Sequence, residues 1–169
     1  MNSKRLRAAY HEAGHAVIGV KYGLRFKHAS IAPQSDSLGR VLFERFGSRF
    51  RPDIMITLRG AEIIEAHAVC SYAGAAAAGL LSGKDFDWTG ADEDRSSAQN
   101  LLSYVEEESD ALGAYLALMR YRARNMVRAR KTAVSKVANK LIEKETLTFS
   151  EIRDLLQPPW MPQWSPRKG

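Results

Sequence analysis

The sequence has very little cysteine: Cys70 is the single one among 169 residues. One cysteine cannot form an intrachain disulfide, which excludes the small secreted domains that disulfides hold together. It also excludes a Cys-X-X-Cys site for zinc or for redox chemistry. Such a chain is expected in a reducing compartment, and the cytoplasm is its predicted location.

Long apolar segments are absent as well. A membrane-spanning helix needs roughly 20 apolar residues, and the longest candidate, residues 69–81, is an alanine-rich run of about half that length. The N-terminus passes from basic residues straight into charged and polar ones, so it lacks the apolar core of a signal peptide. Hydrophobic residues still make up 45% of the chain, too many for a disordered protein. The sequence therefore predicts one soluble domain with a single core and no membrane span.

The net charge is +6, and it is distributed unevenly. Residues 85–110 hold nine acidic side chains and one basic side chain, whereas residues 120–140 hold eight basic side chains and no acidic one. A basic stretch can bind nucleic acid or an acidic partner. This one contains Tyr121 but no series of interleaved aromatic residues for base stacking, which argues against a nucleic-acid partner. The simpler interpretation is a solvent-exposed helix face whose apolar side turns inward.

Hydrophobic periodicity predicts a mainly α-helical domain (α+β class) with a small β-hairpin or sheet. The first helix covers residues 4–23, with apolar positions three and four apart and Gly23 as its C-terminal cap. Short β-prone runs at residues 27–32 and 40–46 flank a turn-rich loop, which predicts an antiparallel pair directly after this helix. Further helices are predicted at residues 52–81, 89–108, 110–143 (as one helix or two) and 148–156.

Individual residues predict where these helices begin. Pro52 suits the first turn of the second helix, and Thr89 suits the cap of the third. Either Thr148 or Ser150 caps the last one. Residues 1–156 are predicted to form the domain, and residues 157–169, which hold four of the six prolines, a Pro/Trp-rich tail.

The sequence His-Glu-Ala-Gly-His at residues 11–15 points to metal chemistry. Residues four apart on a helix lie on one face, ~6 Å apart, so His11 and His15 present both imidazoles to one point. Two neutral imidazole nitrogens suit Zn²⁺. Glu12 lies one step round the helix, where it can reach a metal-bound water and act as a general base.

A catalytic zinc ion needs a third protein ligand and keeps a fourth position for water. The extended pattern with a third histidine fails, because Lys21 stands where that histidine would be. His28 and His67 are interpreted as ordinary packing or surface residues. Spacing alone leaves the acidic candidates open, and they are Glu62, Glu65, Asp85, Asp87, Asp92, Glu93 and Asp94.

Five segments occur together, in order, over about residues 8–156: AYHEAGHAV at 9–17, SIAP at 30–33, LGRV at 38–41, TGADED at 89–94 and LIEKETL at 141–147. Together they resemble the zinc peptidase domain of FtsH-type AAA proteases. The resemblance implies one Zn²⁺ per chain, held by His11, His15 and Asp94, the aspartate that ends the family's Thr-Gly-Ala-X-X-Asp segment. It also implies a strand beside the cleft, which would bind an extended peptide by strand addition. The residues of that strand are Arg40, Val41, Leu42 and Phe43.

The sequence also departs from this family. Residues 73–78 read Ala-Gly-Ala-Ala-Ala-Ala where the family usually has Gly-Gly-Arg-X-Ala-Glu, so an arginine and a glutamate are missing. If that glutamate orients the metal ligands without binding the zinc itself, its loss would alter zinc affinity or activity. The family's ATPase domain and membrane anchor are not in this sequence. We therefore expect flexible substrates or a separate ATPase or delivery partner, and the family's ring assembly implies a homo-oligomer as one arrangement.

These observations predict a zinc metalloendopeptidase that hydrolyses peptide bonds in unfolded or flexible protein segments. Zinc would activate a water molecule and polarise the scissile carbonyl, while Glu12 takes the proton and passes it to the leaving amine. The alternative is a non-catalytic interaction module in which zinc is structural and the basic stretch binds a partner. Glu12 favours the peptidase, because a structural site needs no base.

Overall fold

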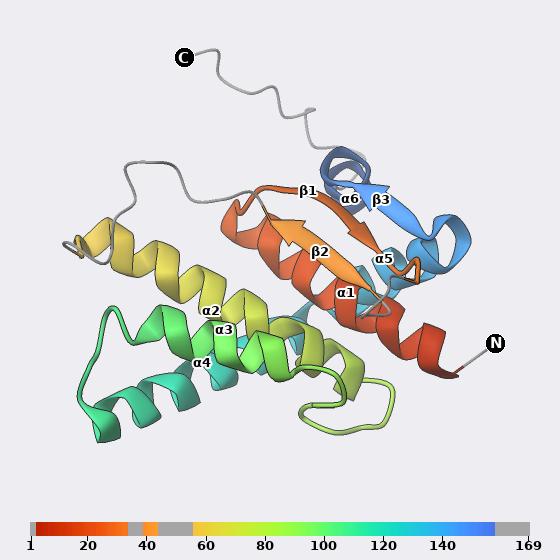
Figure 1. The fold of residues 1–169 in the computed structure, drawn as a ribbon. Coiled ribbons are helices and arrows are strands. Elements are labelled where there is room, and N and C mark those ends of the chain that lie inside the picture. The colour runs from red at the N-terminus through yellow and green to blue at the C-terminus, as the bar shows by residue number, and fades with distance from the viewer. Residues whose placement is uncertain (1–2, 34–38, 44–55, 158–169) are drawn as a thin grey trace, which may run out of the picture.

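The computed structural model describes residues 3–33, 39–43 and 56–157. Within these ranges the chain forms six helices and three short strands, which confirms the predicted mainly helical domain with a small sheet (Figure 1). The elements are α1 (Ser3–Tyr22), β1 (Phe26–Ser30), β2 (Arg40–Phe43), α2 (Leu58–Gly79), α3 (Asp92–Leu102), α4 (Ser109–Ala129), α5 (Lys131–Lys144), β3 (Thr146–Thr148) and α6 (Phe149–Leu156).

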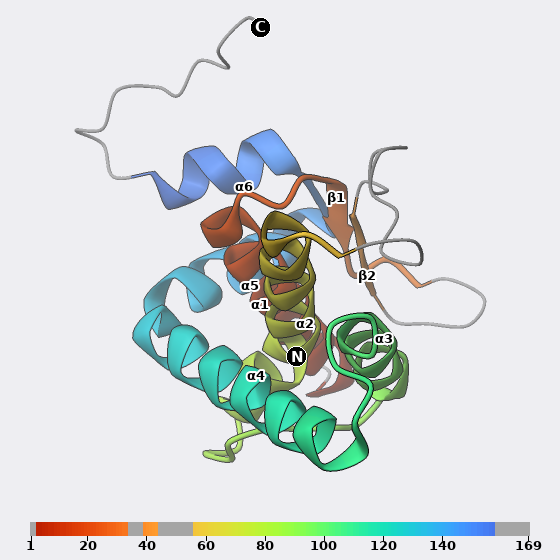
Figure 2. The same cartoon turned by 90° about the vertical axis from the view of Figure 1, so that its left-hand side faces the viewer.

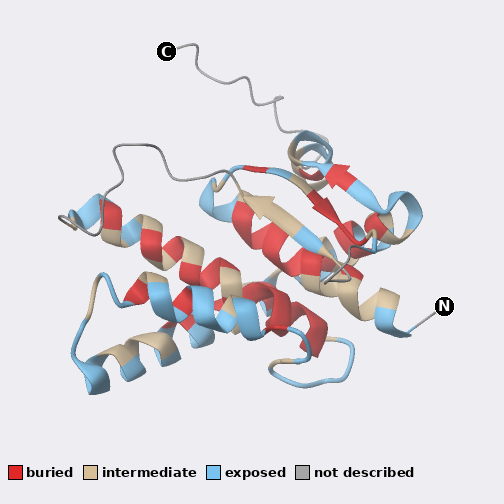
Figure 3. Cartoon of the chain, in the orientation of Figure 1, coloured by how far each residue is buried: buried red, intermediate tan, exposed pale blue. Residues whose placement is uncertain are grey.

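Helices α1 and α2 form the centre of the molecule and pack along each other (Figure 1). Small residues make this contact. At Gly14 of α1, a Cβ atom would lie 2.3 Å from the carbonyl oxygen of Ala73 and 2.6 Å from the Cβ atom of Ala77, both on α2. Only a residue without a side chain fits at such a crossing. The middle of α1 and most of α2 are therefore buried (Figure 3).

The sheet has the order β2–β1–β3, and both pairs of strands are antiparallel. β1 and β2 are the predicted pair, while the predicted continuation of β2 to Phe46 lies outside the described residues. β3, in which Leu147 pairs with Ala29 of β1, was not predicted. A three-residue Thr-Leu-Thr strand is too short to show the two-residue period by which strands are recognised. The buried Phe26 of β1 joins the sheet to the core beneath it.

Helices α4 and α5 cover the central pair, α4 against α2 and α5 against α1 (Figure 2). The predicted segment 110–143 is thus two helices that meet at Arg130. None of the eight basic residues between 120 and 140 is buried, as the exposed-face interpretation expects. The residues that turn inward are apolar: Met119, Ala123 and Val127 on α4, and Val134, Val137, Ala138 and Leu141 on α5.

Two predicted helix starts are wrong. Helix α2 begins at Leu58, capped by the Thr57 side chain, which accepts a hydrogen bond from the Gly60 N–H at 3.0 Å. Pro52 lies outside the described residues. Helix α3 begins at Asp92 rather than next to Thr89, because the Thr89 hydroxyl donates to a carboxylate instead of capping a helix.

The predicted end of the third helix is also wrong. α3 stops at Leu102, short of Glu108, whose side chain instead accepts hydrogen bonds from the first backbone N–H groups of α4. The last helix follows one of the two predicted alternatives. Thr148 caps α6 in a reciprocal capping box with Glu151. The predicted tail lies outside the described residues from 158 onward, so the division at residue 156 stays a prediction.

In the described ranges, no helix is both long and apolar enough to cross a membrane.

Candidate metal centre

Three side chains that are far apart in the sequence meet between α1 and α3. His11 and His15 stand one turn apart on α1, and Asp94 lies in the first turn of α3. The Nε2 atom of His11 lies 3.0 Å from Nε2 of His15 and 3.0 Å from Oδ2 of Asp94. The third side of this triangle, from His15 Nε2 to the same carboxylate oxygen, is 3.3 Å. The structure thus brings together the two predicted histidines and the aspartate that the family resemblance indicated.

The triangle has the size of one face of a tetrahedral zinc site. Bonds of about 2.0–2.1 Å at tetrahedral angles separate neighbouring ligand atoms by roughly 3.3 Å. Two ring nitrogens and one carboxylate oxygen are also a donor set that Zn²⁺ accepts. Among the described residues, this is the group of histidine, cysteine and acidic side chains whose ligand atoms gather around one point. The side chains present therefore fit a divalent ion such as Zn²⁺.

Local contacts place Asp94, and not its neighbours, at the centre. Because α3 begins at Asp92, both Asp92 and Glu93 point into solvent at the positive end of the helix, while the Asp94 side chain is only 26% exposed. The loop before the helix is tied to α1, since the Arg7 guanidinium donates a hydrogen bond to the carbonyl oxygen of Thr89. This tie holds the start of α3 against the histidine-bearing helix.

The other candidates serve elsewhere in the fold. Glu65 and Asp85 form ion pairs with arginines of α4, and Asp87 accepts hydrogen bonds from the residue two positions later. The ring of His67 lies edge-on against Phe43, with 5.8 Å between the centroids. The candidates that the structure does not bring to the two histidines are Glu62, Glu65, Asp85, Asp87, Asp92, Glu93, His28 and His67.

Hydrogen bonds to residue 70 of α2 orient the buried His15. His15 Nδ1 donates a hydrogen bond to the carbonyl oxygen of Cys70 at 2.8 Å, and the Cys70 thiol donates to the carbonyl oxygen of His15 at 3.2 Å. A neutral ring with its proton on Nδ1 would leave the Nε2 lone pair available to a metal ion at the triangle. A metal-ligating histidine commonly donates its other N–H in this way. Burial raises the pKa of the Cys70 thiol, which suits a hydrogen-bond donor rather than a thiolate.

Burial and mutual attraction shift the pKa values of Asp94, His15 and His11 in different directions. Burial disfavours a charge on Asp94, but the two imidazoles outweigh burial and hold the pKa of its carboxyl well below the usual range. Burial also opposes a charge on His15, yet the Asp94 carboxylate raises the pKa of His15 well above its usual value. Burial lowers the pKa of His11. Because ring nitrogens must be unprotonated to bind a metal, metal binding at this cluster would compete with protonation of the histidines.

Glu12 lies next to this cluster and is only 6% exposed. The backbone N–H of Val41 donates to its carboxylate, and Gly39 approaches so closely that a Cβ atom there would lie 2.7 Å from Oε1. Burial raises the pKa of Glu12 to about 7. A carboxyl group in this range can take up and release a proton near neutral pH.

The four residues predicted to bind substrate form β2, at the edge of the sheet (Figure 1). One side of β2 pairs with β1, and in the described part of the chain no strand pairs with its other side. Because Val41 of β2 contacts Glu12, this edge runs directly beside the predicted base. The strand and the predicted base are thus neighbours, while the binding of substrate by this strand stays a prediction.

The basic stretch of α4 is largely occupied by contacts within the chain. Arg122 pairs with Glu65 at 2.7 Å, and both Arg124 and Arg128 pair with Asp85. These pairs neutralise part of the charge that the alternative interaction module would offer to a partner.

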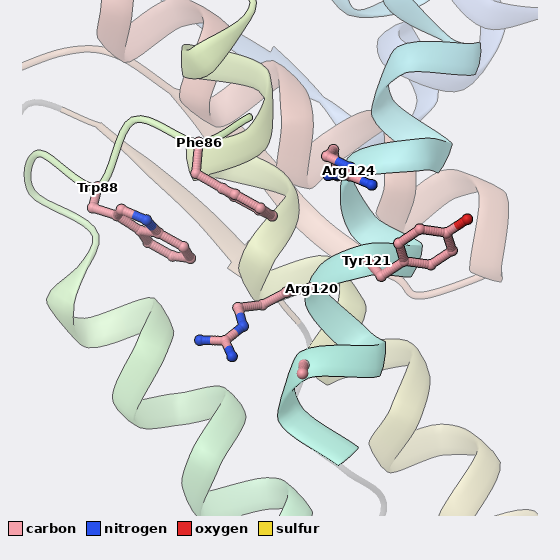
Figure 4. Close-up of a pocket in the computed structure, with 6 residues that line it drawn as sticks. Phe86, Trp88, Arg120, Tyr121 and Arg124 are labelled. Atoms are coloured by element: carbon pink, nitrogen blue, oxygen red, sulfur yellow. The ribbon is translucent and has the colours of Figure 1, made fainter. Parts of the chain in front are cut away.

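A separate pocket of about 340 Å³ lies between α4 and the loop that follows α2 (Figure 4). The rings of Phe86 and Trp88 stack on its loop side, with 4.7 Å between centroids. The lining residues are Phe86, Trp88, Ala117, Arg120, Tyr121 and Arg124. None of them belongs to the metal centre, so the pocket and the predicted chemistry are in different places.

The known proteins that this chain resembles include three ATP-dependent zinc metalloproteases of the FtsH type. No protein-family model matches the chain. The ATP-dependent zinc metalloprotease FtsH 1 of Symbiobacterium thermophilum is 32% identical over 173 residues, which cover 90% of this chain and 29% of that protein. The chloroplastic/mitochondrial zinc metalloproteases FTSH 11 of Arabidopsis thaliana and FTSH 9 of Oryza sativa are each 27% identical, over 93% and 89% of this chain. The chain spans less than a third of the length of each of these relatives.

Proposed function

Since this chain contains an FtsH-type domain over about 90% of its length, we propose that it is a zinc metalloendopeptidase. In this proposal His11, His15 and Asp94 hold one Zn²⁺, and Glu12 is the general base. The observation that carries it is the triangle of two ring nitrogens and one carboxylate oxygen, with sides of 3.0, 3.0 and 3.3 Å, next to a buried carboxyl group.

Each residue has a defined part in peptide hydrolysis. A bound zinc ion would supply a Lewis acid that lowers the pKa of water and polarises the scissile carbonyl. Glu12 takes a proton from the attacking water and passes it to the leaving amine. The Val41 N–H and the close approach of Gly39 hold the Glu12 carboxylate in place for this transfer. The Cys70 carbonyl fixes the orientation of the His15 ring.

The substrate in this proposal is an extended polypeptide segment. The side of β2 that no described strand covers offers backbone N–H and C=O groups to an added strand. Val41, whose own N–H donates to Glu12, brings that strand next to the base. Only unfolded or flexible segments can add to an edge strand in this way. We therefore propose that folded substrates need a separate ATPase or another delivery partner in the cytoplasm. A homo-oligomer remains part of the proposal through the family resemblance.

Metal content tests the ligand assignment. Mass spectrometry of the native protein should find about one zinc per chain in the wild type and almost none in Asp94→Ala. Asp92→Ala is the matched control, because Asp92 lies in the same helical turn but is exposed, so it should retain zinc. Equal zinc in both variants would contradict Asp94 as a ligand, and a wild type without zinc would contradict the proposal as a whole.

Cleavage of unfolded casein tests the role of Glu12. Glu12→Gln should keep its zinc but lose activity by roughly 10²–10⁴-fold, because the amide cannot accept the proton. Glu93→Gln, which changes an exposed glutamate beside Asp94, should cleave like the wild type. A wild type that binds zinc but cleaves nothing, alone or with an added unfoldase, would instead support the structural-zinc interaction module.

A further inference from the structure

Gly74 is the residue of α2 that lies directly against the two histidines. A Cβ atom at this position would lie 2.3 Å from Nε2 of His15 and 2.7 Å from Nε2 of His11. These are the two nitrogen atoms that form the triangle with Asp94. Real Cβ atoms essentially never approach another heavy atom so closely, so a side chain at residue 74 and the present positions of both rings are incompatible.

Helical preference does not explain a glycine here. Apart from proline, glycine is the least favourable residue in a helix interior, and alanine is the most favourable. Residues 73 and 75–78 around Gly74 are all alanine, and the whole run is buried in α2. A glycine inside such a run indicates a local reason to leave out the side chain.

The close approach of α1 and α2 does not explain it either. That approach is made at Gly14, whose missing Cβ atom would meet the backbone carbonyl of Ala73. At Gly74 the nearest atoms belong to imidazole rings, not to the backbone. The two glycines therefore have different neighbours and different consequences.

We propose that Gly74 is a positioning residue that keeps the space in front of the two Nε2 atoms free for the metal ion. This inference rests on the proposed function, since it concerns the same ion. A zinc ion must come within about 2.1 Å of both ring nitrogens, the region that a side chain at residue 74 would enter. In this arrangement α2 builds the wall of the metal centre from backbone alone, through the Cα of Gly74 and the carbonyl of Cys70.

The histidines cannot simply move aside to admit a methyl group. The His15 side chain is 7% exposed, and its Nδ1–H is fixed to the Cys70 carbonyl oxygen at 2.8 Å. Moving the ring away from residue 74 would lengthen this hydrogen bond and open the triangle with Asp94. Since zinc ligands must match their bond lengths within about 0.2 Å, a shift of that kind removes a competent site without requiring the domain to unfold.

The test is metal binding by Gly74→Ala, with no activity assay needed. Titration with Co²⁺, followed by its visible absorption, and with Zn²⁺, followed by calorimetry, should show affinity weakened by roughly 10- to 100-fold, as for loss of a supporting group. The matched control is Gly113→Ala, because Gly113 lies in α4 and no atom would come within 4 Å of its Cβ atom. Gly113→Ala should bind both ions like the wild type.

Thermal unfolding separates loss of the ion from loss of the fold. Added Zn²⁺ should raise the Tm of the wild type and of Gly113→Ala, but not the Tm of Gly74→Ala. If Gly74→Ala is destabilised even in chelator, the same substitution in a His11→Ala/His15→Ala background should lower the Tm much less, because both clashing rings are gone.

Three results would overturn the inference. One is wild-type Co²⁺ and Zn²⁺ affinity in Gly74→Ala. Another is an equal loss of Tm with and without the two histidine rings, which would assign the clash to the helix contact. A wild type that binds neither ion would contradict the proposed function and the inference together, so it is distinguishable from a failure of the inference alone.

Discussion

The two sides of α2 make different kinds of contact: small residues face α1, and long side chains face α4. Toward α1, glycine and alanine bring the two helices so close that Gly14 has no room for a methyl group. Toward α4, the contact includes long side chains, such as the ring of Tyr115 and the guanidinium of Arg122, both bonded to Glu65. Figure 3 shows that α2 is buried along most of its length while α4 exposes its outer face.

This difference determines where the spacing between helices can vary and where it is fixed. Long side chains adjust their rotamers, so the spacing of α2 and α4 can vary by fractions of an ångström. Backbone in contact with backbone cannot adjust in this way. The proposed ligands His11 and His15 stand on the tight side, where the position of α2 fixes the ring of His15 through the Cys70 carbonyl.

The largest effect is expected where the tight side is broken. Gly14→Ala places a Cβ atom 2.3 Å from the Ala73 carbonyl oxygen, so the helices must separate. We expect a loss of about 2–3 kcal/mol in the free energy of unfolding, measured by urea denaturation in chelator. Gly113→Ala is the control and should be slightly stabilising, since it adds helical preference at an exposed site. If Gly14→Ala were as stable as the wild type, α1 and α2 could separate at little cost. The α1 side of α2 would then be no tighter than the α4 side.

Sequence patterns predicted the local parts of this design. The helical period and the spacing of His11 and His15 predicted a metal site on α1, and the turn-rich loop predicted the β1–β2 pair. Both depend on residues close together in the sequence. Thr89 was misassigned as a cap because its hydroxyl can equally serve a neighbouring carboxylate, and only the folded loop shows that Asp87 receives it.

The long-range parts could not be predicted from spacing. Asp94 follows His11 by 83 positions, and seven acidic residues were open candidates until the family resemblance indicated one of them. The contributions of Cys70 and Gly74 were missed altogether, because a backbone carbonyl and a missing side chain leave no chemical pattern. A glycine within a run of alanines was the available indication.

A smaller effect is expected on the adaptable side. Tyr115→Phe removes the hydrogen bond to Glu65 and should cost about 0.5–1 kcal/mol at neutral pH. Burial, together with the hydrogen bond and the charge of Glu65, raises the pKa of Tyr115 to about 12, from a usual value of 10.0. The folded state thus holds this proton more tightly than the unfolded state does. The stabilisation is fully present below pH 10 and is lost as the pH rises from about 10 to about 12.

Urea unfolding of both proteins at pH 9 and pH 11 checks this sign. The difference in stability between the wild type and Tyr115→Phe should shrink at pH 11, while metal binding near neutral pH should be the same in both. A constant difference would show that the tyrosine proton is not linked to folding. A change in metal affinity would show that the α4 side also sets the geometry of the centre.

The smallest effect is expected from adding atoms on the adaptable side. Ala117 is exposed on α4 and lines the pocket of about 340 Å³, so Ala117→Leu places its extra carbons in open space. Leucine and alanine are both good helix formers, and we expect the free energy of unfolding to stay within about 0.5 kcal/mol of the wild type. Three added carbons here should therefore cost less than the single added carbon of Gly14→Ala. Chemical denaturation measures both losses. If Ala117→Leu lost more free energy of unfolding than Gly14→Ala, the cost of a substitution would depend on the number of atoms added rather than on the packing of each side of α2.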